Sequence, residues 1–302
     1  MGFSVTTDSS HSSDAKLLLA LKSGIVDYNE YHCSWAGIQC DHSNHIISLD
    51  HSNMNLTGQI LPEIGHLRSL INLTVAENAF TGPFPDEITN AVGLRLFNIS
   101  NNIFVGYFHS HFSRLQDLEI LDVYNNFTGP LPLDIIGLKN VRHLHLGGNY
   151  FSGGIPHQYG RWPKLEYLAV SGNELGGAIP VGLGNLRQLK ELYVGYHNSF
   201  DGGIPLEIGK LTNLRRMDMS ECELSGPIPP ESHNLVNLDT LFLQVNNLSA
   251  PLPPVLGELK SLRSMDLSNN LLKGEIPKEF SLLKELTLMN LFRNRLHGSI
   301  PS

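Results

Sequence analysis

The stretch Leu165-Glu-Tyr-Leu-Ala-Val-Ser-Gly-Asn-Glu-Leu-Gly-Gly-Ala-Ile-Pro180 contains the features that decide the fold of this 302-residue chain. Its apolar and outward positions alternate, which predicts a short β-strand with Leu168 and Val170 in the core and Ala169 outside. Asn173 then turns the chain, and its amide can bond buried backbone groups of neighbouring turns. The closing glycine-to-proline segment predicts a second extended strand at an edge where no amide donor is needed.

The same pattern recurs to the end of the chain with a spacing of 24 residues, apart from one step of 23 and one of 25. Eleven copies align, with these residues in the asparagine slot: Met54, Asn78, Asn102, Asn126, Asn149, Asn173, Asn198, Cys222, Asn246, Asn270 and Asn294. A fixed period of this length with Leu-x-Leu-x-x-Asn predicts an α/β leucine-rich-repeat solenoid whose parallel strands form the concave face. The step of 23 follows Asn126, so we expect its turn to lack one residue.

Three segments are expected along the chain. Residues 1–12 are polar and predict a disordered segment, without the basic and apolar regions of a secretion signal. Residues 13–45 predict an N-terminal cap that includes a short helix from Ser13 to Gly24. Residues 46–302 predict a solenoid of about eleven repeats with no C-terminal cap, since the last repeat is cut short.

Charge and motifs exclude several classes of function. The net charge is −8 without any block of like charge, which argues against nucleic acid as a partner. No apolar run approaches the roughly 20 residues of a membrane span. No catalytic triad, paired carboxylates or phosphate-binding loop stands out from the repeats, so we expect a non-enzyme without a cofactor.

The three cysteines divide into a pair and a single residue. A disulfide between Cys33 and Cys40 would close a small loop before the first repeat and requires an oxidising compartment; the alternative is two reduced thiols. Cys222 occupies an asparagine slot and is expected to be an inert core thiol. His143 and His145 share a strand face, but no third ligand is evident, so no metal site is predicted. A modest pH effect of this histidine pair is more plausible.

Gly-x-Ile-Pro elements at Gly153–Pro156, Gly202–Pro205 and Gly274–Pro277 make the repeats resemble the plant-specific extracellular leucine-rich repeat. This form occurs in receptor kinases, receptor-like proteins and polygalacturonase inhibitors. Strand segments such as His143-Leu-His-Leu-Gly-Gly-Asn149 and Leu192-Tyr-Val-Gly-Tyr196 further resemble the CLAVATA class, particularly the "barely any meristem" receptor kinases. The resemblance implies a right-handed superhelix, an extracellular or plasma-membrane-associated location and a receptor-kinase co-receptor. The family's kinase domain and membrane span are not in this chain.

The candidate binding surface is the concave strand face. Aromatic side chains on one face favour an interface, and ten strand spacings of about 4.8 Å match an extended peptide of about 12 residues. The resemblance implies a short secreted CLE-type peptide as ligand; the alternatives are an inhibitor of a pathogen cell-wall-degrading enzyme and a co-receptor-binding scaffold. The predicted peptide-binding residues are Asp122, Tyr124, His145, Gly147, Tyr193, Tyr196, Asp218, Glu221, Phe242, Gln244, Asp266, Phe292 and Arg293.

Five Asn-x-Ser/Thr sequons are candidate glycosylation sites if the chain is secreted. Asn126 is expected to be buried in the ladder, and Asn98 points to the concave face, where a glycan would obstruct the groove. The predicted glycosylation sites are therefore Asn55, Asn72 and Asn247.

Overall fold

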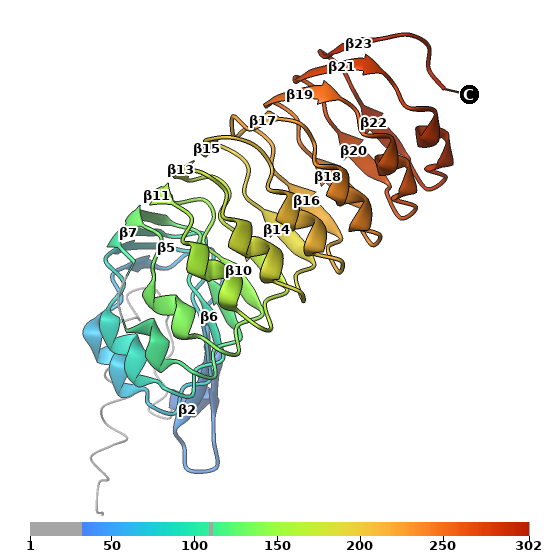
Figure 1. The fold of residues 1–302 in the computed structure, drawn as a ribbon. Coiled ribbons are helices and arrows are strands. Elements are labelled where there is room, and N and C mark those ends of the chain that lie inside the picture. Colours follow the sequence, from blue (N-terminus) through green and yellow to red (C-terminus); the bar gives the residue numbers. More distant parts are fainter. Residues whose placement is uncertain (1–31, 109–110, 302) are drawn as a thin grey trace, which may run out of the picture.

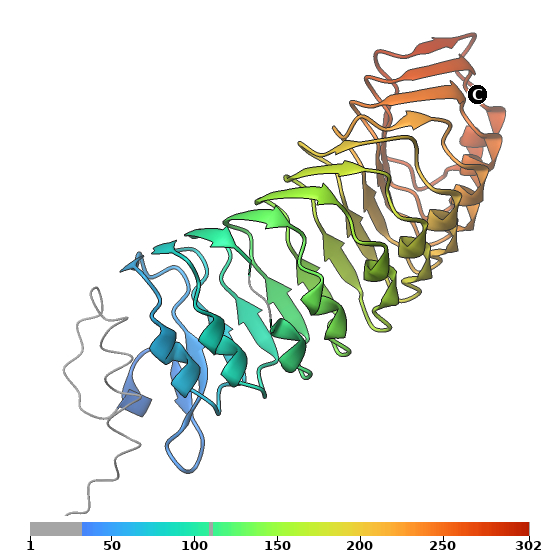
Figure 2. The ribbon, with the colours of Figure 1, turned by 60° about the vertical axis from the view of Figure 1, so that its left-hand side comes forward.

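The computed structural model describes residues 32–108 and 111–301. These residues form one elongated solenoid in which each repeat lies against the next (Figures 1 and 2). The predicted disordered segment, 1–12, and the predicted cap helix, Ser13 to Gly24, lie outside the described residues. None of the helices in the described part is long and apolar enough to cross a membrane.

The concave face is a 12-stranded sheet in which each repeat contributes one short strand. Strand β1 is antiparallel to β2, and from β2 onward neighbouring strands are parallel. The strands are β1 (Ile38–Cys40), β2 (Ile46–Asp50), β4 (Asn72–Thr74), β6 (Leu96–Asn98), β8 (Ile120–Asp122), β10 (His143–His145), β12 (Tyr167–Ala169), β14 (Glu191–Tyr193), β16 (Arg216–Asp218), β18 (Thr240–Phe242), β20 (Ser264–Asp266) and β22 (Leu288–Asn290).

The second extended segment of each repeat forms further parallel sheets along one flank. A seven-stranded sheet contains β3 (Thr57–Gly58), β5 (Ala79–Gly82), β7 (Ile103–Tyr107), β9 (Asn126–Pro130), β11 (Tyr150–Gly154), β13 (Glu174–Gly177) and β15 (Ser199–Phe200). A four-stranded sheet contains β17 (Ser225–Gly226), β19 (Asn247–Pro251), β21 (Leu271–Glu275) and β23 (Arg295–His297). A second extended strand is therefore present in each repeat, but it lies earlier than predicted: in the quoted stretch it is Glu174–Gly177, and the predicted segment Gly177–Pro180 is a strand only at its glycine.

The remaining side of each repeat is a single short helical turn of the 3₁₀ type. These segments are η1 (His32–Ser34), η2 (Pro62–His66), η3 (Asp86–Asn90), η4 (Phe112–Arg114), η5 (Asp134–Gly137), η6 (His157–Arg161), η7 (Val181–Asn185), η8 (Leu206–Lys210), η9 (Pro230–Asn234), η10 (Pro254–Glu258) and η11 (Lys278–Leu282). Most begin at the residue after a proline such as Pro156 or Pro180, whose extended backbone ends the preceding segment. Within 32–108 and 111–301 every helical segment is 3₁₀, so the helical part of the repeat is tighter than an α-helix.

A continuous apolar core runs through the solenoid. In the quoted stretch Leu168 and Val170 have no exposed surface, as predicted. Ala169, predicted to lie outside, is only 1% exposed and stands between His145 and Tyr193 in the sheet. In the early repeats the core is rich in phenylalanine, and Phe84 packs edge-on against Phe97 and Phe104. Because each repeat covers the apolar side of the next, the core needs no central nucleus.

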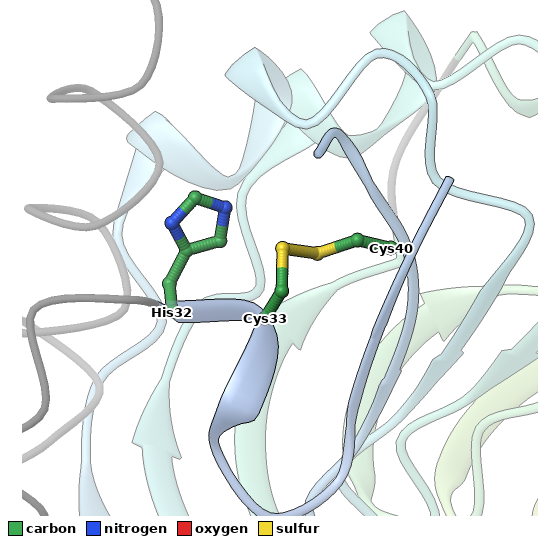
Figure 3. A group of neighbouring side chains, drawn as sticks. All are labelled: His32, Cys33 and Cys40. Atoms are coloured by element: carbon green, nitrogen blue, oxygen red, sulfur yellow. A yellow bond between two sulfur atoms is a disulfide. The ribbon is translucent and has the colours of Figure 1, made fainter. Parts of the chain in front are cut away.

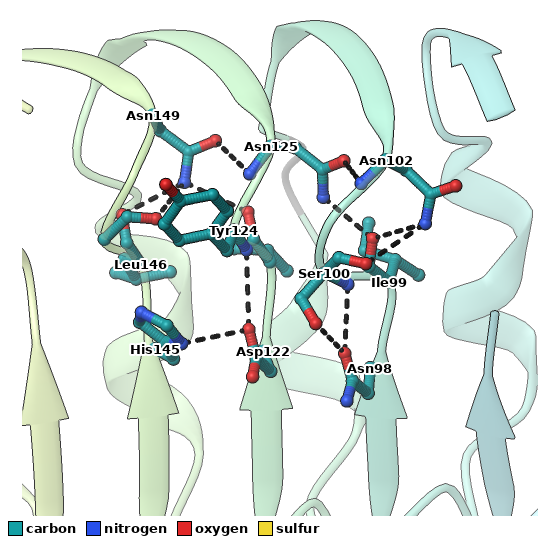
Figure 4. A network of polar contacts seen from close by, with 12 residues as sticks. Asn98, Ile99, Ser100, Asn102, Asp122, Tyr124, Asn125, His145, Leu146 and Asn149 are labelled. Atoms are coloured by element: carbon teal, nitrogen blue, oxygen red, sulfur yellow. Dashed lines mark hydrogen bonds and ion pairs between the residues drawn. The ribbon is translucent and has the colours of Figure 1, made fainter. Parts of the chain in front are cut away.

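The asparagine ladder supports the turns that follow the concave strands (Figure 4). Asn149 shows the pattern: its side-chain oxygen accepts hydrogen bonds from the backbone N–H groups of Asn125 and Phe127, at 3.1 and 3.0 Å. Its amide group donates to the backbone oxygens of Val123 and Leu146, at 3.0 and 3.1 Å. The side chain is 5% exposed, so these bonds satisfy backbone groups that water cannot reach.

The ladder position of the shortened repeat is Asn125, and the prediction of Asn126 for this position was wrong. Asn125 is buried, and its amide donates to Ile99 O at 2.9 Å, whereas Asn126 is half-buried and begins β9. The missing residue therefore lies before the ladder asparagine, because a single residue, Tyr124, separates Val123 from Asn125. The step of 23 falls between Asn102 and Asn125.

Cys222 replaces an asparagine in the ladder and is fully buried. Its thiol donates to Met219 O at 2.9 Å, and burial raises the thiol pKa to about 12. Thiol reactivity requires the thiolate, so this environment agrees with the predicted inert core thiol. In this rung the backbone N–H of Phe200 donates to the carbonyl of Cys222 instead of to a side-chain oxygen.

A disulfide joins Cys33 to Cys40 before the first repeat (Figure 3), as predicted. It connects η1 to β1, the strand that pairs with β2. Trp35 is buried within the bridged loop, and His51 hydrogen-bonds Ala36 O at 3.1 Å. The described part of the cap is thus fastened to the first repeat by both covalent and polar contacts.

Candidate functional site

Two columns of side chains cross the concave sheet, because parallel pairing aligns equivalent residues of successive strands. The first column stands at the strand starts: Ile120, His143, Tyr167, Glu191, Arg216 and Thr240. The second stands at the strand ends: Asp122, His145, Ala169, Tyr193, Asp218 and Phe242. Both columns share one face, since residues two apart in a strand point the same way.

In several repeats, the second-column residue supports the turn that follows its strand. The Asp218 carboxylate accepts hydrogen bonds from the N–H and hydroxyl of Ser220, at 3.0 and 2.6 Å, and Asp218 is only 9% exposed. Asp266 accepts from the Ser268 N–H in the same way, at 2.9 Å. These two predicted binding residues therefore have a structural role that the sequence prediction did not assign.

In the middle repeats, aromatic and histidine side chains occupy both columns, and Tyr124 adds a ring from the turn after β8. Tyr124, His145, His143, Tyr167 and Tyr193 form a continuous chain of ring contacts. The closest contact is between His143 and Tyr167, whose rings stack with centroids 4.0 Å apart and planes 11° apart. We call these five residues the aromatic band.

Sequence reasoning missed Tyr167, which lies at the centre of the band. Its ring also approaches those of His145 and Tyr193, with centroids at 6.0 and 5.4 Å. Burial, together with the nearby carboxylates Asp122 and Glu191, raises the pKa of Tyr167 to about 12, so its phenol stays protonated. The alternation of inward and outward residues along β12 could have identified Tyr167, because it lies two residues before Ala169, which was predicted to point outward. Ala169 itself is 1% exposed.

Tyr124 is one end of the band, and Asp122 lies beside it next to His145 (Figure 4). The His145 Nδ1 atom lies 3.2 Å from the Asp122 Oδ1 atom. The Tyr124 ring lies so close to Gly148 that a Cβ atom there would be 1.9 Å from the ring, and Gly148 has a φ of 62°. A glycine at 148 is therefore required both by the backbone conformation and by this aromatic contact.

A small cavity lies at the other end of the band. Its volume is about 270 Å³, and it is lined by Tyr193, Arg216, Met217, Asp218, Thr240 and Phe242. The Tyr193 hydroxyl donates to Glu191 Oε2 at 2.6 Å, and burial together with this bond raises the Tyr193 pKa. The Arg216 guanidinium lies 3.9 Å from Glu191 and 4.0 Å from Asp239. The lining therefore combines two aromatic rings, Tyr193 and Phe242, with the charged side chains of Arg216 and Asp218.

Three predicted residues, Tyr196, Glu221 and Arg293, stand at the edge of the sheet. Each has a φ between 52° and 57° in the turn before the ladder position, and this left-handed conformation projects its side chain away from the core. Tyr196 is 40% exposed. Tyr196 follows β14, the last strand of the band, whereas Glu221 and Arg293 follow β16 and β22, beyond it.

The other predicted residues fall outside the ring contacts. Gly147 follows β10 and leaves room for its neighbours, because a Cβ atom there would lie 2.8 Å from Ser171 O. Gln244 follows β18, and its side-chain oxygen is buried without a hydrogen-bond partner among the described residues. Phe292 is 66% exposed and contacts Arg293, whose guanidinium lies 5.3 Å from the ring centroid. Phe292 follows β22, two strands beyond the strand of Phe242.

A second hollow, of about 660 Å³, lies on the flank between the ladder turns and the second sheet. Its lining includes Tyr124, Asn126, Tyr150, Glu174 and His197. This hollow is separate from the cavity at Tyr193.

The sequons occupy two different surfaces. Asn55 and Asn247 are exposed on the flank, directly after a ladder position, and Asn126 occupies the equivalent place. Asn72 instead pairs with Ser48 and Leu96 in the first column of the concave sheet, so it shares that face with Asn98. The sequence prediction separated Asn72 from Asn98, whereas the register places both on the concave face.

Comparisons with known proteins agree with this architecture. The family model "Leucine Rich Repeat" matches residues 140–162, 164–186, 213–235 and 261–283, and no kinase-domain family matches the chain. MDIS1-interacting receptor like kinase 1 of Arabidopsis thaliana is 36% identical over 87 residues, which are 25% of this chain and 9% of that kinase.

Solved structures show the same likeness. A TDR receptor structure has a TM-score of 0.82 and 41% identity over 84% of this chain and 44% of the other. The Arabidopsis receptor kinase HAESA, solved with the peptide hormone IDA and the co-receptor SERK1, has a TM-score of 0.83 and 26% identity over 96% of this chain and 54% of its own. The chain is therefore a leucine-rich-repeat solenoid that resembles plant receptor-kinase ectodomains. It spans about half the length of these solved structures and far less of the curated relative.

Proposed function

We propose that this chain is an extracellular peptide-binding unit of the plant receptor type, which holds a short secreted peptide in an extended conformation across the aromatic band. The observation that supports this function is the uninterrupted ring contact from Tyr124 to Tyr193 on one face of the sheet. Rigid aromatic side chains bind with a small loss of conformational entropy, which makes them frequent anchors of interfaces.

The dimensions suit a peptide. The six strands from β8 to β18 have five spacings of about 4.8 Å, or about 24 Å, which is the length of about seven extended residues. The cavity beside Tyr193 can receive one peptide side chain. The band covers β8 to β14 and the cavity extends this surface to β18, so band and cavity together are long enough for the centre of a 12-residue peptide.

The charges predict which peptide side chains bind there. Three carboxylates, Asp122, Glu191 and Asp239, flank the band, and Arg216 lies between two of them. Basic and proline-rich peptides would complement these carboxylates and rings. CLE-type peptides are our preferred ligands from the sequence resemblance, and the hormone complex of HAESA supports peptide binding on this kind of scaffold. A SERK-type co-receptor is the corresponding proposed partner.

Calorimetric titration of synthetic CLE-type peptides into secreted, monomeric protein tests this function. A Tyr193→Ala variant should weaken binding at least about 30-fold, the effect of losing a hot-spot side chain. Ser264→Ala is the matched control, because Ser264 lies in the first column on β20, beyond the band. Absence of binding by folded wild-type protein, or equal losses in both variants, would contradict the proposal.

A further inference from the structure

Three potential metal ligands meet at the start of the aromatic band. Asp122 on β8 and His143 and His145 on β10 each offer one ligand atom, and these three atoms lie within 4.8 Å of one another. The sequence predicted no metal site, because a third ligand beside the two histidines was not evident. The parallel register supplies it, since Asp122 pairs directly with His145.

We propose that Asp122, His143 and His145 form a zinc-binding site on the concave face. Zinc takes histidine nitrogens and carboxylate oxygens at about 2.0–2.2 Å, and three protein ligands with one open position form a recurrent zinc coordination. Tetrahedral geometry at these distances separates ligand atoms by about 3.4 Å. The Asp122–His145 contact is already 3.2 Å, and all three ligand atoms lie within 4.8 Å of one another.

The surroundings hold the imidazoles in place. Tyr167 stacks on the His143 ring, and the Tyr124 and Tyr167 rings both contact the His145 ring. These contacts restrict rotation of the two imidazole rings. In known metal sites, residues that contact the ligands but not the metal orient the ligands in a similar way. Burial also lowers the pKa of His143, which favours the neutral imidazole that metals require.

The choice of zinc follows from the donor set. Two nitrogens and one carboxylate suit zinc and its transition-metal neighbours, whereas calcium and magnesium prefer oxygen ligands only. The open coordination position would face the concave surface and could take water or a donor from a bound peptide.

Titration of zinc chloride into chelator-treated, dialysed protein tests the site by calorimetry. We expect one zinc ion per chain with a micromolar dissociation constant. Asp122→Asn and His145→Gln should each weaken zinc binding by about 100-fold or more, beyond the 10–100-fold loss typical of an outer-shell partner. The control is a His66→Gln/His157→Gln variant, which removes two exposed histidines on η2 and η6.

Cobalt provides a second measurement that depends on coordination geometry. A tetrahedral cobalt site gives strong visible absorption, which should appear in the wild type and in the control variant and be absent in Asp122→Asn. Circular dichroism confirms that each variant is folded. Zinc uptake that survives both cluster substitutions, or that is lost in the control variant, would overturn the site.

These results are independent of peptide binding, because both titrations use the protein without peptide. A folded protein that binds zinc but no CLE-type peptide would retain the zinc site and refute the peptide proposal. A folded protein that binds the peptide but no zinc would refute the zinc site and leave only the contact between Asp122 and His145.

Discussion

The asparagine ladder and the aromatic band run side by side through the same repeats, but their side chains have opposite environments. The ladder side chain of Asn149 is 5% exposed and bonds backbone groups of two repeats. In the band, Tyr124 is exposed and Tyr167 is half-buried, and their rings contact other rings. The comparison supports a division in which the ladder positions carry stability and the band positions carry the proposed peptide binding.

The second column of the concave sheet shows this separation most clearly. Asp50, Asn98, Asp218 and Asp266 each accept a hydrogen bond from the serine two residues later. In the middle repeats the same column holds His145, Ala169, Tyr193 and Phe242, which cannot support the turn in this way. Of these side chains His145, Tyr193 and Phe242 are partly exposed and can contact the proposed ligand, whereas Ala169 is 1% exposed.

The largest effect is expected from breaking the ladder. Asn149→Ala removes the acceptor of two buried N–H groups and the donor to three backbone oxygens. We expect a loss of about 3 kcal/mol in the free energy of unfolding, because unsatisfied buried polar groups cost about 1–3 kcal/mol each. Chemical denaturation measures this loss. Asn126→Ala, at the half-buried neighbour, should cost less than about 0.5 kcal/mol, and equal losses would contradict the corrected ladder assignment.

Removing the central ring of the band should affect binding more than stability. Tyr167→Ala deletes contacts with His143, His145 and Tyr193. We expect about 2 kcal/mol of peptide-binding free energy to be lost, or about 30-fold in affinity. Titration calorimetry with the peptide that binds the wild type measures this. Tyr167→Phe keeps the ring and should retain most of the affinity, whereas full affinity in Tyr167→Ala would place the peptide elsewhere.

A substitution in the second column distinguishes the structural role from the binding role. Asp218→Ala leaves the N–H and hydroxyl of the fully buried Ser220 without their acceptor. We expect a loss of about 1.5 kcal/mol of stability, measured by denaturant unfolding. Asp218→Asn is the matched control, because Asn98 accepts the equivalent bonds from Ser100 in its own repeat. A destabilised Asn variant with a stable Ala variant would refute the turn role.

The fold could be predicted from the sequence because the period is repeated eleven times and each repeat satisfies the same packing rule. Single residues were harder to place. Adjacent asparagines at Asn125 and Asn126 hid the ladder position, since only the backbone path shows which amide reaches the core. Tyr167 and the third potential metal ligand, Asp122, depend on which strands are neighbours and in what register. Such contacts between repeats are absent from the pattern within one repeat.

The smallest expected effect is a pH dependence of stability at His51, which lies in the first repeat next to the cap. His51 is 2% exposed, and burial lowers its pKa although Ala36 O and Asp50 favour the charged form. The unfolded chain, with a histidine pKa of about 6.5, therefore takes up the proton first as pH falls. The stability contributed by neutral His51 is complete above about pH 6.5 and is lost as pH falls toward the lowered pKa. Denaturant unfolding between pH 7.5 and 5 should show a shallower loss for His51→Gln than for the wild type. Identical slopes would show that this buried imidazole does not control the acid sensitivity of the cap.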